Sequence, residues 1–362
     1  MVQAPSIAGR RTVMEYYAGI DVSLELSSVC VVDAKGKIVK EMKVASDPDA
    51  LALFFKSLGV EVARIGIEAG PLSQWLHAGL TLAGFETVLL ETRHVKAALS
   101  AMTVKTDRKD ARGIAHLIRM GWFRPVHCKS APAQEVRALL VARKQLLGKL
   151  LDIEFSIRGI LRGFGLKMGL VTRKSFEARV RELCAGQAML EQIAEAILSA
   201  RAGLQKAYTR LHQAMLAITR RDPVCRRLMT TPGVGPLVAI TFKTAVDDPA
   251  RIQKSKAVGA LFGLTPKKYQ SGETDVTGGI TRVGDEMVRT ALYEAANVLL
   301  SRVTRFSALK RWGMDIAKRR GTKRAKVALA RKIGVILHRM WIDDTSFRWT
   351  REARGGKKLT CA

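Results

Sequence analysis

The sequence has few residues of the kinds that build disulfide frameworks, zinc fingers or membrane spans. Its cysteines number five, are widely separated and include no Cys-x-x-Cys pair: Cys30, Cys128, Cys184, Cys225 and Cys361. An odd, scattered set argues against disulfides and zinc fingers and fits a reducing, cytoplasmic location. No uncharged apolar run reaches the roughly 18 residues of a membrane span, and residues 1–11 lack a signal peptide's apolar core. We therefore expect no membrane partner.

Acidic residues are also scarce, and this scarcity points to a polyanionic partner. The chain of 362 residues has 32 Asp and Glu against 61 Lys and Arg, a net charge of +29 and a pI near 10.4. A domain pI above about 9 is typical of nucleic-acid-binding proteins, because each neutralised phosphate releases condensed counterions. A merely soluble basic surface explains the charge less well, since self-repulsion would destabilise the free protein. We expect a nucleoid-associated protein.

Residues 16–125 have the mixed pattern of an α/β domain. Short apolar stretches predict strands and longer amphipathic ones predict helices. The predicted strands are Tyr16–Asp21, Ser27–Asp33, Ile38–Val44, Arg64–Glu68 and Thr87–Leu90. The predicted helices are Leu51–Leu58, Leu72–Ala83 and Asp107–Met120.

The rest of the chain is predicted to be mainly helical. Residues 134–222 carry apolar positions at three- and four-residue steps, which predicts a long helix up to Gly163 and a second from Phe176 to Thr219. The two could form an antiparallel hairpin within one chain or a coiled coil between subunits. Residues 223–345 form a third region, and 346–362 a basic tail. From Ser301 onward, 18 Lys and Arg face 4 Asp and Glu, a net +14.

In a chain so short of acids, four of them stand at informative places. Asp21 and Glu68 end two predicted strands, and Asp107 and Asp110 begin a predicted helix. The i, i+3 spacing puts the last two on one helix face. Carboxylates from two strand ends and one helix could converge on Mg²⁺, which prefers oxygen ligands. Taken singly, Asp107 could be only a helix cap, Asp110 could pair with Arg108 or Lys109, and the strand-end acids could be turn residues.

These acids carry a family resemblance. Gly19-Ile20-Asp21-Val22-Ser23, Glu68 after a later strand, and Lys105-Thr106-Asp107-Arg108-Lys109-Asp110-Ala111 resemble the RNase H-like domain of RuvC-type resolvases. They resemble still more the DEDD transposases of insertion sequences, which are related to Piv-type invertases. The resemblance implies that Asp21, Glu68, Asp107 and Asp110 are catalytic ligands of Mg²⁺ or Mn²⁺.

Two later blocks extend the resemblance, which covers about residues 16–345. Thr231-Pro232-Gly233-Val234-Gly235-Pro236 resembles a helix-hairpin-helix turn, where Gly233 and Gly235 would let a phosphate approach backbone N–H groups. Tyr269-Gln270-Ser271-Gly272, followed by a glycine-rich stretch with Arg282 and Arg289, resembles the family's C-terminal domain. There the matching serine is the proposed nucleophile, here Ser271, and the two arginines are expected to contact nucleic acid. Gln270 and Glu273-Thr274 depart from the family pattern.

The leading hypothesis is an insertion-sequence recombinase that holds DNA on Ser271 while strands exchange. No Ser-His-Asp spacing surrounds Ser271, so activation by the metal site would have to supply the base. We expect element-end and target DNA as partners, a homodimer or homotetramer, and a charge that also permits an element-encoded guide RNA. The alternatives are a junction-resolvase-like nuclease that uses water, an actin-like kinase, and a non-catalytic nucleic-acid-binding protein.

Overall fold

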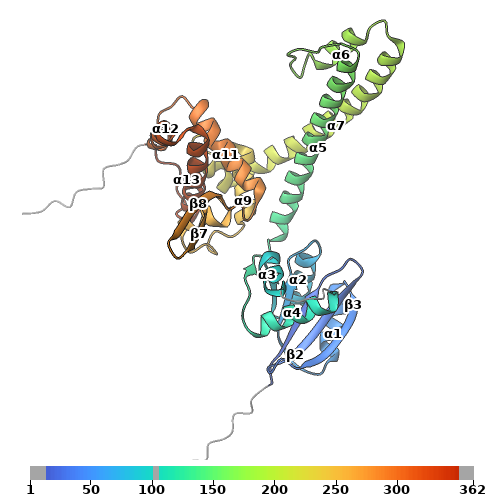
Figure 1. Ribbon diagram of the computed structural model, residues 1–362, viewed down its shortest axis with the longest axis vertical. Coiled ribbons are helices and arrows are strands. Elements are labelled where there is room, and N and C mark those ends of the chain that lie inside the picture. The colour runs from blue at the N-terminus through green and yellow to red at the C-terminus, as the bar shows by residue number, and fades with distance from the viewer. Residues whose placement is uncertain (1–13, 101–105, 350–362) are drawn as a thin grey trace, which may run out of the picture. The chain divides into compact units, whose positions relative to one another are not determined.

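The chain divides into two compact units, residues 1–129 and 130–362 (Figure 1). The structure is a computed structural model that describes residues 14–100 and 106–349. Lys105 of the acidic motif and residues 350–362 of the basic tail lie outside the described residues. A mixed α/β unit followed by a mainly helical one agrees with the predicted fold class at that level.

The first unit is built on a six-stranded sheet in the order β3-β2-β1-β4-β5-β6. β1, β2 and β3 form an antiparallel meander. On the other side of β1, β4 pairs with β1 and β5 pairs with β4, both in parallel, and β6 is an edge strand antiparallel to β5. The strands are β1 (Tyr16–Asp21), β2 (Leu26–Asp33), β3 (Ile38–Ala45), β4 (Val62–Glu68), β5 (Thr87–Leu90) and β6 (Pro125–Val126). The five strands predicted from the sequence are confirmed, and β6 was missed.

Both faces of this sheet are covered, because successive side chains of a strand point to opposite faces. Ala18 and Ile20 face the cluster formed with α1 (Pro48–Ser57) and α2 (Ser73–Leu82). Tyr17 faces the side covered by α4 (Asp107–Arg119), with α3 (Thr92–Leu99) beside it. The sequence analysis did not predict α3, whose only buried residue is Val95.

The second unit begins with a helical hairpin in a single chain. α5 (Ala131–Gly163) and α7 (Ala188–Arg221) pack against each other, with the short α6 (Phe176–Cys184) between them in sequence. Ser130 caps α5 through its hydroxyl and also hydrogen-bonds Asp247. The predicted second helix from Phe176 to Thr219 is broken between α6 and α7, where Gly186 has a φ of +80° that other residues rarely adopt.

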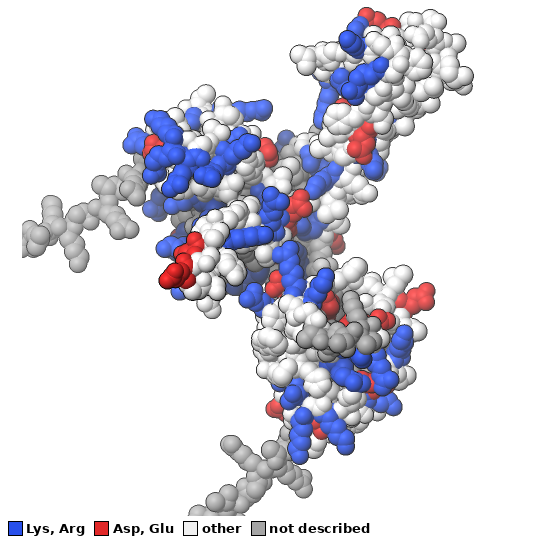
Figure 2. Space-filling view, viewed as in Figure 1, with Lys and Arg blue, Asp and Glu red and all other residues white. Residues whose placement is uncertain are grey.

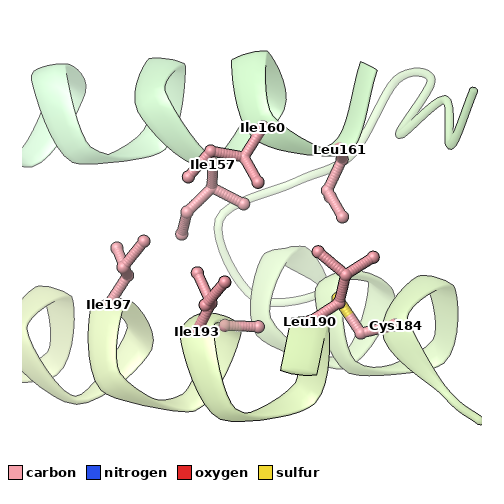
Figure 3. Close-up of a pocket in the computed structure, with 8 residues that line it drawn as sticks. Ile157, Ile160, Leu161, Cys184, Leu190, Ile193 and Ile197 are labelled. Atoms are coloured by element: carbon pink, nitrogen blue, oxygen red, sulfur yellow. The ribbon is translucent and has the colours of Figure 1, made fainter. Parts of the chain in front are cut away.

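The two ends of the hairpin belong to different cores. Figure 3 shows the distal end, where Ile157 and Leu161 of α5 face Leu190 and Ile193 of α7 across an apolar seam. At the other end, Leu140 and Met215 are buried in the core of the C-terminal helices. The sequence analysis set residues 134–222 apart as a region of their own, but this shared core joins them to the rest of the second unit.

The C-terminal helices pack around a single core. They are α8 (Pro223–Leu228), α9 (Pro236–Val246), η1 (Ser255–Ala257), α10 (Val258–Leu261), α11 (Glu286–Ser301), α12 (Ala308–Arg320) and α13 (Thr322–Ile342). Between α10 and α11 stands a two-stranded sheet of β7 (Pro266–Ser271) and β8 (Thr274–Ile280), which the sequence analysis did not predict. α13 buries Leu329, Ile333 and Leu337. The described part of the basic stretch after Ser301 therefore contributes to a folded core, and Phe347 still packs against that core.

Three of the described cysteines, Cys30, Cys184 and Cys225, are buried free thiols. Burial raises the pKa of Cys30 and of Cys225 to about 12. Thiols held protonated in this way are unreactive. Within residues 14–100 and 106–349, no helix combines the length and apolar character needed to cross a membrane.

Candidate active site

Two of the predicted acids end neighbouring parallel strands. Asp21 is the last residue of β1 and Glu68 the last of β4, and the register pairs Ile20 with Ile67 just before them. Ile20 and Ile67 face the α1–α2 side of the sheet. Because side chains alternate along a strand, Asp21 and Glu68 point to the other face, the one that α4 covers.

α4 crosses that face over a pair of glycines. Gly19 and Gly66 are register partners on β1 and β4. A Cβ placed on Gly19 would lie 2.2 Å from the carbonyl oxygen of Ala111, and one on Gly66 would lie 2.4 Å from Ile118. Only glycines at these two positions allow the helix to lie directly on the sheet.

The direction of α4 follows from its last turn. Arg119 donates from Nη1 to the carbonyl of Ala34, just after β2, at 3.2 Å. The end of β2 lies beside the start of β1, since Asp33 pairs with Tyr16. α4 therefore runs antiparallel to β1, and its first turn lies toward the edge where Asp21 and Glu68 stand.

The acids of α4 lie on the face that packs against the sheet. Asp107 and Asp110 precede the buried Ala111 and Ile114 by one turn each. All four predicted acids thus share one face and one edge of the first unit. Among the residues that the structure describes, however, no three His, Cys, Asp or Glu side chains form a group that could hold a metal ion. The four-ligand metal site therefore stays a prediction.

The simpler explanations for the acids of α4 do not hold. Thr106, not Asp107, is the N-cap, since its hydroxyl accepts from the N–H of Lys109. Arg108 ion-pairs with Glu41 on β3 rather than with Asp110, and Arg112 joins the same carboxylate. Neither capping nor this ion pairing explains why acids stand at positions 107 and 110.

The donor set fits a hard divalent cation. Carboxylate oxygens alone, with room for water and phosphate, are the ligands that Mg²⁺ and Mn²⁺ prefer. Asp21, Glu68 and Asp110 are half-buried and Asp107 is exposed, so the edge is open to a ligand on one side. The residues present therefore suit a magnesium ion in the chemistry of their donor atoms.

Ser271 stands apart from these acids in the sequence, in the second unit. It ends β7 opposite Thr274 of β8, and Gly272 follows in the left-handed region with a φ of +53°. The sequence analysis predicted no strand here, whereas Ser271 ends a strand and closes a two-residue hairpin turn. Every residue of β7 is exposed, so the hydroxyl can be reached from solvent.

The predicted helix-hairpin-helix turn joins α8 to α9, and its glycines differ in role. A Cβ on Gly233 would lie 2.4 Å from the carbonyl oxygen of Ala295 on α11, so this glycine is needed for packing between helices. Gly235 is the N-cap of α9 and has open space around it. Of the two glycines, Gly235 alone has the open space that the predicted phosphate contact requires.

The two predicted nucleic-acid-binding arginines also differ. Arg289 donates from Nη1 to the carbonyls of Phe262, Val283 and Gly284, and so fastens the loop that precedes α11. Arg282 lies in that loop with an exposed side chain and a φ of +57°. Arg289 is thus mainly a positioning residue, while the side chain of Arg282 is open to solvent.

Comparisons with known proteins give the family. The DEDD transposase model of IS110 elements matches residues 18–165, and the IS116/IS110/IS902 transposase family model matches residues 225–312. The transposase for insertion sequence element IS1111A of Coxiella burnetii is 27% identical over 91% of this chain and 90% of its own length. The chain belongs to the DEDD-type insertion-sequence transposases.

Other relatives of this chain are also transposases. A probable family 20 transposase of Pseudomonas aeruginosa is 25% identical over 91% of this chain and 98% of its own length. A putative transposase of Sinorhizobium fredii is 28% identical over 67% of this chain and 64% of its own length. As a DEDD-type transposase, the protein is an enzyme that cleaves and recombines DNA, and DNA is its partner.

The sequence analysis overlooked the glycines that position this transposase's acids. Gly19-Ile20-Asp21 and Gly66-Ile67-Glu68 repeat one pattern, a glycine two residues before a strand-end acid. Residues two apart on a strand lie on the same face of the sheet, so each glycine is on the face to which its acid points. The repeated pattern therefore indicates that a helix packs on the sheet beside the acids.

We expect Gly19→Ala to destabilise the first unit of this transposase by about 1–3 kcal/mol or more, as overpacking does. The added methyl group would meet backbone atoms of Ala111 and Ala115, which cannot rotate away. Hydrogen exchange followed by mass spectrometry would report peptides of the first unit separately. Gly148→Ala is the matched control, because Gly148 lies in α5 with nothing near it. Unchanged protection of β1 and α4 in Gly19→Ala would contradict the packing described above.

Proposed function

We propose that this transposase cuts and rejoins DNA by using Mg²⁺ held on Asp21, Glu68, Asp107 and Asp110, and that Ser271 keeps the cut strand covalently attached. The observation that carries the metal-site part is the shared face of the four acids. Two come from adjacent strand ends and two from the helix turn above the same edge. The sheet order and the helix on this face also support an RNase H-like, RuvC-like fold for the first unit.

In this proposal the four carboxylates bind the ions and thereby orient the scissile phosphate. Bound Mg²⁺ supplies activation of the attacking oxygen and stabilisation of the leaving one, and Mn²⁺ can substitute. Arg108 and Arg112 remain committed to Glu41, so they do not compete for the carboxylates.

Ser271 supplies the covalent step. Its Oγ attacks phosphorus and gives up its proton, a phosphorus–oxygen bond of the DNA breaks, and the released strand end leaves as a hydroxyl. A new strand's hydroxyl then reverses these changes, so the phosphodiester bond is conserved without any energy source. The exposure of the hairpin and the absence of a side chain on Gly272 support this role, since a phosphate can approach the hydroxyl.

Two further partners belong to the proposal. A second copy of the chain is supported by large exposed apolar side chains on the helical hairpin, among them Phe155, Phe164 and Met189. An RNA encoded by the same element is the second such partner, and the net charge of +29 is compatible with it.

We expect nicking of supercoiled DNA to require Mg²⁺ or Mn²⁺ and to fail with Ca²⁺. Mg²⁺ demands tight octahedral geometry, whereas Ca²⁺ accepts looser coordination and positions phosphate poorly. Gel electrophoresis of plasmid incubated with purified protein and each ion would measure this. Cleavage that persists in EDTA would overturn the metal-dependent mechanism while leaving the family assignment in place.

A further inference from the structure

A groove on the second unit lies apart from Ser271 and its turn. Its volume is about 870 Å³, within the range of roughly 300–1,000 Å³ that is usual for ligand sites. β8 and the loop after it form one wall, and α13 forms the other, with single contributions from η1 and α12. The groove lies wholly within one unit, so its shape is set by local packing.

The charge around this groove is of one sign. Six exposed cations line it: Lys256, Arg282, Lys323, Arg324, Arg331 and Lys332. No Asp or Glu lines it, and none of the six joins an ion pair with any described residue. In Figure 2, Lys and Arg gather over the part of this unit that holds α12 and α13. Unpaired like charges repel one another, so the groove is suited to a bound polyanion.

The floor of the groove is apolar. Leu264 and Ile280 lie beneath one wall, and Val327 and Val335 of α13 beneath the other. Trp312 of α12 is 38% exposed at the groove, and the ammonium of Lys332 lies 5.6 Å from the centre of its ring. A groove that bound phosphate alone would have no use for an exposed indole and an aliphatic floor.

The wall of the groove that β8 forms lets a ligand come close to the backbone. Gly278 and Gly279 line the groove, and a Cβ on Gly279 would meet nothing within 4 Å. Arg282 follows, with its backbone held in the left-handed region by a loop that Arg289 fastens. A strained backbone that the surroundings fix in this way is commonly found at ligand sites.

We propose that this groove binds an unpaired segment of the DNA strand, with a base stacked on Trp312 and phosphates on the six cations. The inference rests on the proposed function, because strand exchange creates unpaired DNA. In a duplex the bases are stacked inside and could not reach the indole or the aliphatic floor. In a single strand each base has a free face, and aromatic platforms inside cationic grooves bind such bases without regard to sequence.

The test is fluorescence anisotropy of the full-length protein with labelled oligothymidylate and with a duplex of equal length, in EDTA so that no cleavage occurs. Trp312→Leu keeps an apolar side chain but removes the aromatic face. We expect it to weaken oligothymidylate binding about tenfold and duplex binding less than twofold. Trp312→Phe should retain binding within about threefold, which shows that a loss in Trp312→Leu is not a loss of folding.

The cations are tested by salt dependence. The triple variant Lys256→Ala, Lys323→Ala, Arg324→Ala should reduce the slope of log affinity against log salt by about 2, since each single-strand phosphate contributes about 0.7. The matched control replaces Lys144, Lys206 and Arg210, which are exposed on α5 and α7. An equal fall in slope for both triple variants would show a general charge effect and overturn the groove assignment.

Three results would overturn the proposal with Trp312. The first is that Trp312→Leu binds oligothymidylate as tightly as the wild-type protein does, and the second is that Trp312→Leu loses as much affinity for the duplex as for oligothymidylate. The third is that oligothymidylate does not bind at all, while Trp312→Leu weakens the binding of labelled oligouridylate in the same assay. The last result would assign the groove to RNA. Because the assay contains no divalent ion, none of these results bears on the carboxylates or on Ser271, and failure of metal-dependent cleavage would leave the groove measurement intact.

Discussion

Asp21→Asn is expected to lower DNA cleavage by about a thousandfold or more while DNA affinity stays within about twofold. Loss of one electrostatic contact to a transition state often costs 10²–10³ in rate, and loss of a metal ligand disturbs several such contacts at once. Affinity rests instead on phosphate contacts, which the net charge of +29 favours. Asparagine keeps the shape of aspartate, so the end of β1 need not move.

The other acids of the edge provide an internal check. Asp107→Asn and Asp110→Asn should lose cleavage in the same way, because both lie on the face of α4 that packs on the sheet. Glu86→Gln is the matched control, because Glu86 is exposed and Arg64 is its one ion-pair partner among the described residues. Cleavage is measured by gel electrophoresis under single-turnover conditions and affinity by anisotropy.

A structural role for these carboxylates would give a different result. Like charges gathered at one edge repel one another unless a cation offsets them. Asp107→Asn and Asp110→Asn should therefore leave the midpoint temperature of unfolding, measured in EDTA, unchanged or raise it. Wild-type cleavage by Asp21→Asn, or a large drop in the midpoint of all three variants, would contradict the metal-site assignment.

The first unit could be predicted from the sequence in considerable detail. β1 was predicted at its observed bounds and α4 within a residue, because a buried strand and an amphipathic helix have distinct apolar periods. β6 has two residues, and α3 has one buried residue, so neither repeats a pattern often enough to be seen. The docking of α4 was missed for another reason: it depends on the absence of side chains at Gly19 and Gly66.

The second unit was harder to predict, because its elements depend on contacts far apart in sequence. Arg201 is 4% exposed and looks like a surface cation in the sequence, but it pairs with Glu154 of α5 and Glu177 of α6. The exposed strands β7 and β8 have no buried face, so period-two hydrophobicity could not reveal them. The sequence analysis predicted helical structure in residues 223–345 but gave no bounds for α13, whose buried residues pack against segments distant in sequence.

The helical hairpin illustrates the limit of periodicity. The repeat along residues 134–163 predicted a long helix correctly but left its partner open, since hairpins and coiled coils share one pattern. In the single chain α5 packs against α7, and Leu140 and Met215 are both buried in the C-terminal core. Those contacts arise from the fold of residues that come later in the sequence.

Ser271→Ala is expected to abolish both recombination and any covalent protein–DNA adduct. A nuclease that hands the phosphate to water loses the phosphodiester bond, whereas a recombinase must conserve it, and a phosphoester to the enzyme does so. Alanine has no oxygen to form that ester. Ser271 is exposed at the end of a hairpin, so the substitution should change stability by no more than about 0.5 kcal/mol. Denaturing gel electrophoresis of protein incubated with labelled DNA and Mg²⁺ measures the adduct.

Thr274→Ala is the matched control for Ser271→Ala, because Thr274 is the cross-strand partner of Ser271 and also carries a hydroxyl. It should form the adduct normally, since the nucleophile is untouched and the hairpin keeps its register. Ser271→Cys should retain a trace of adduct, because a thiolate is also a nucleophile. An adduct that forms equally well with Ser271→Ala would place the nucleophile elsewhere. Cleavage by the wild-type protein without any adduct would mean that water attacks the phosphate, as in a resolvase, and that the hairpin serves only to bind DNA.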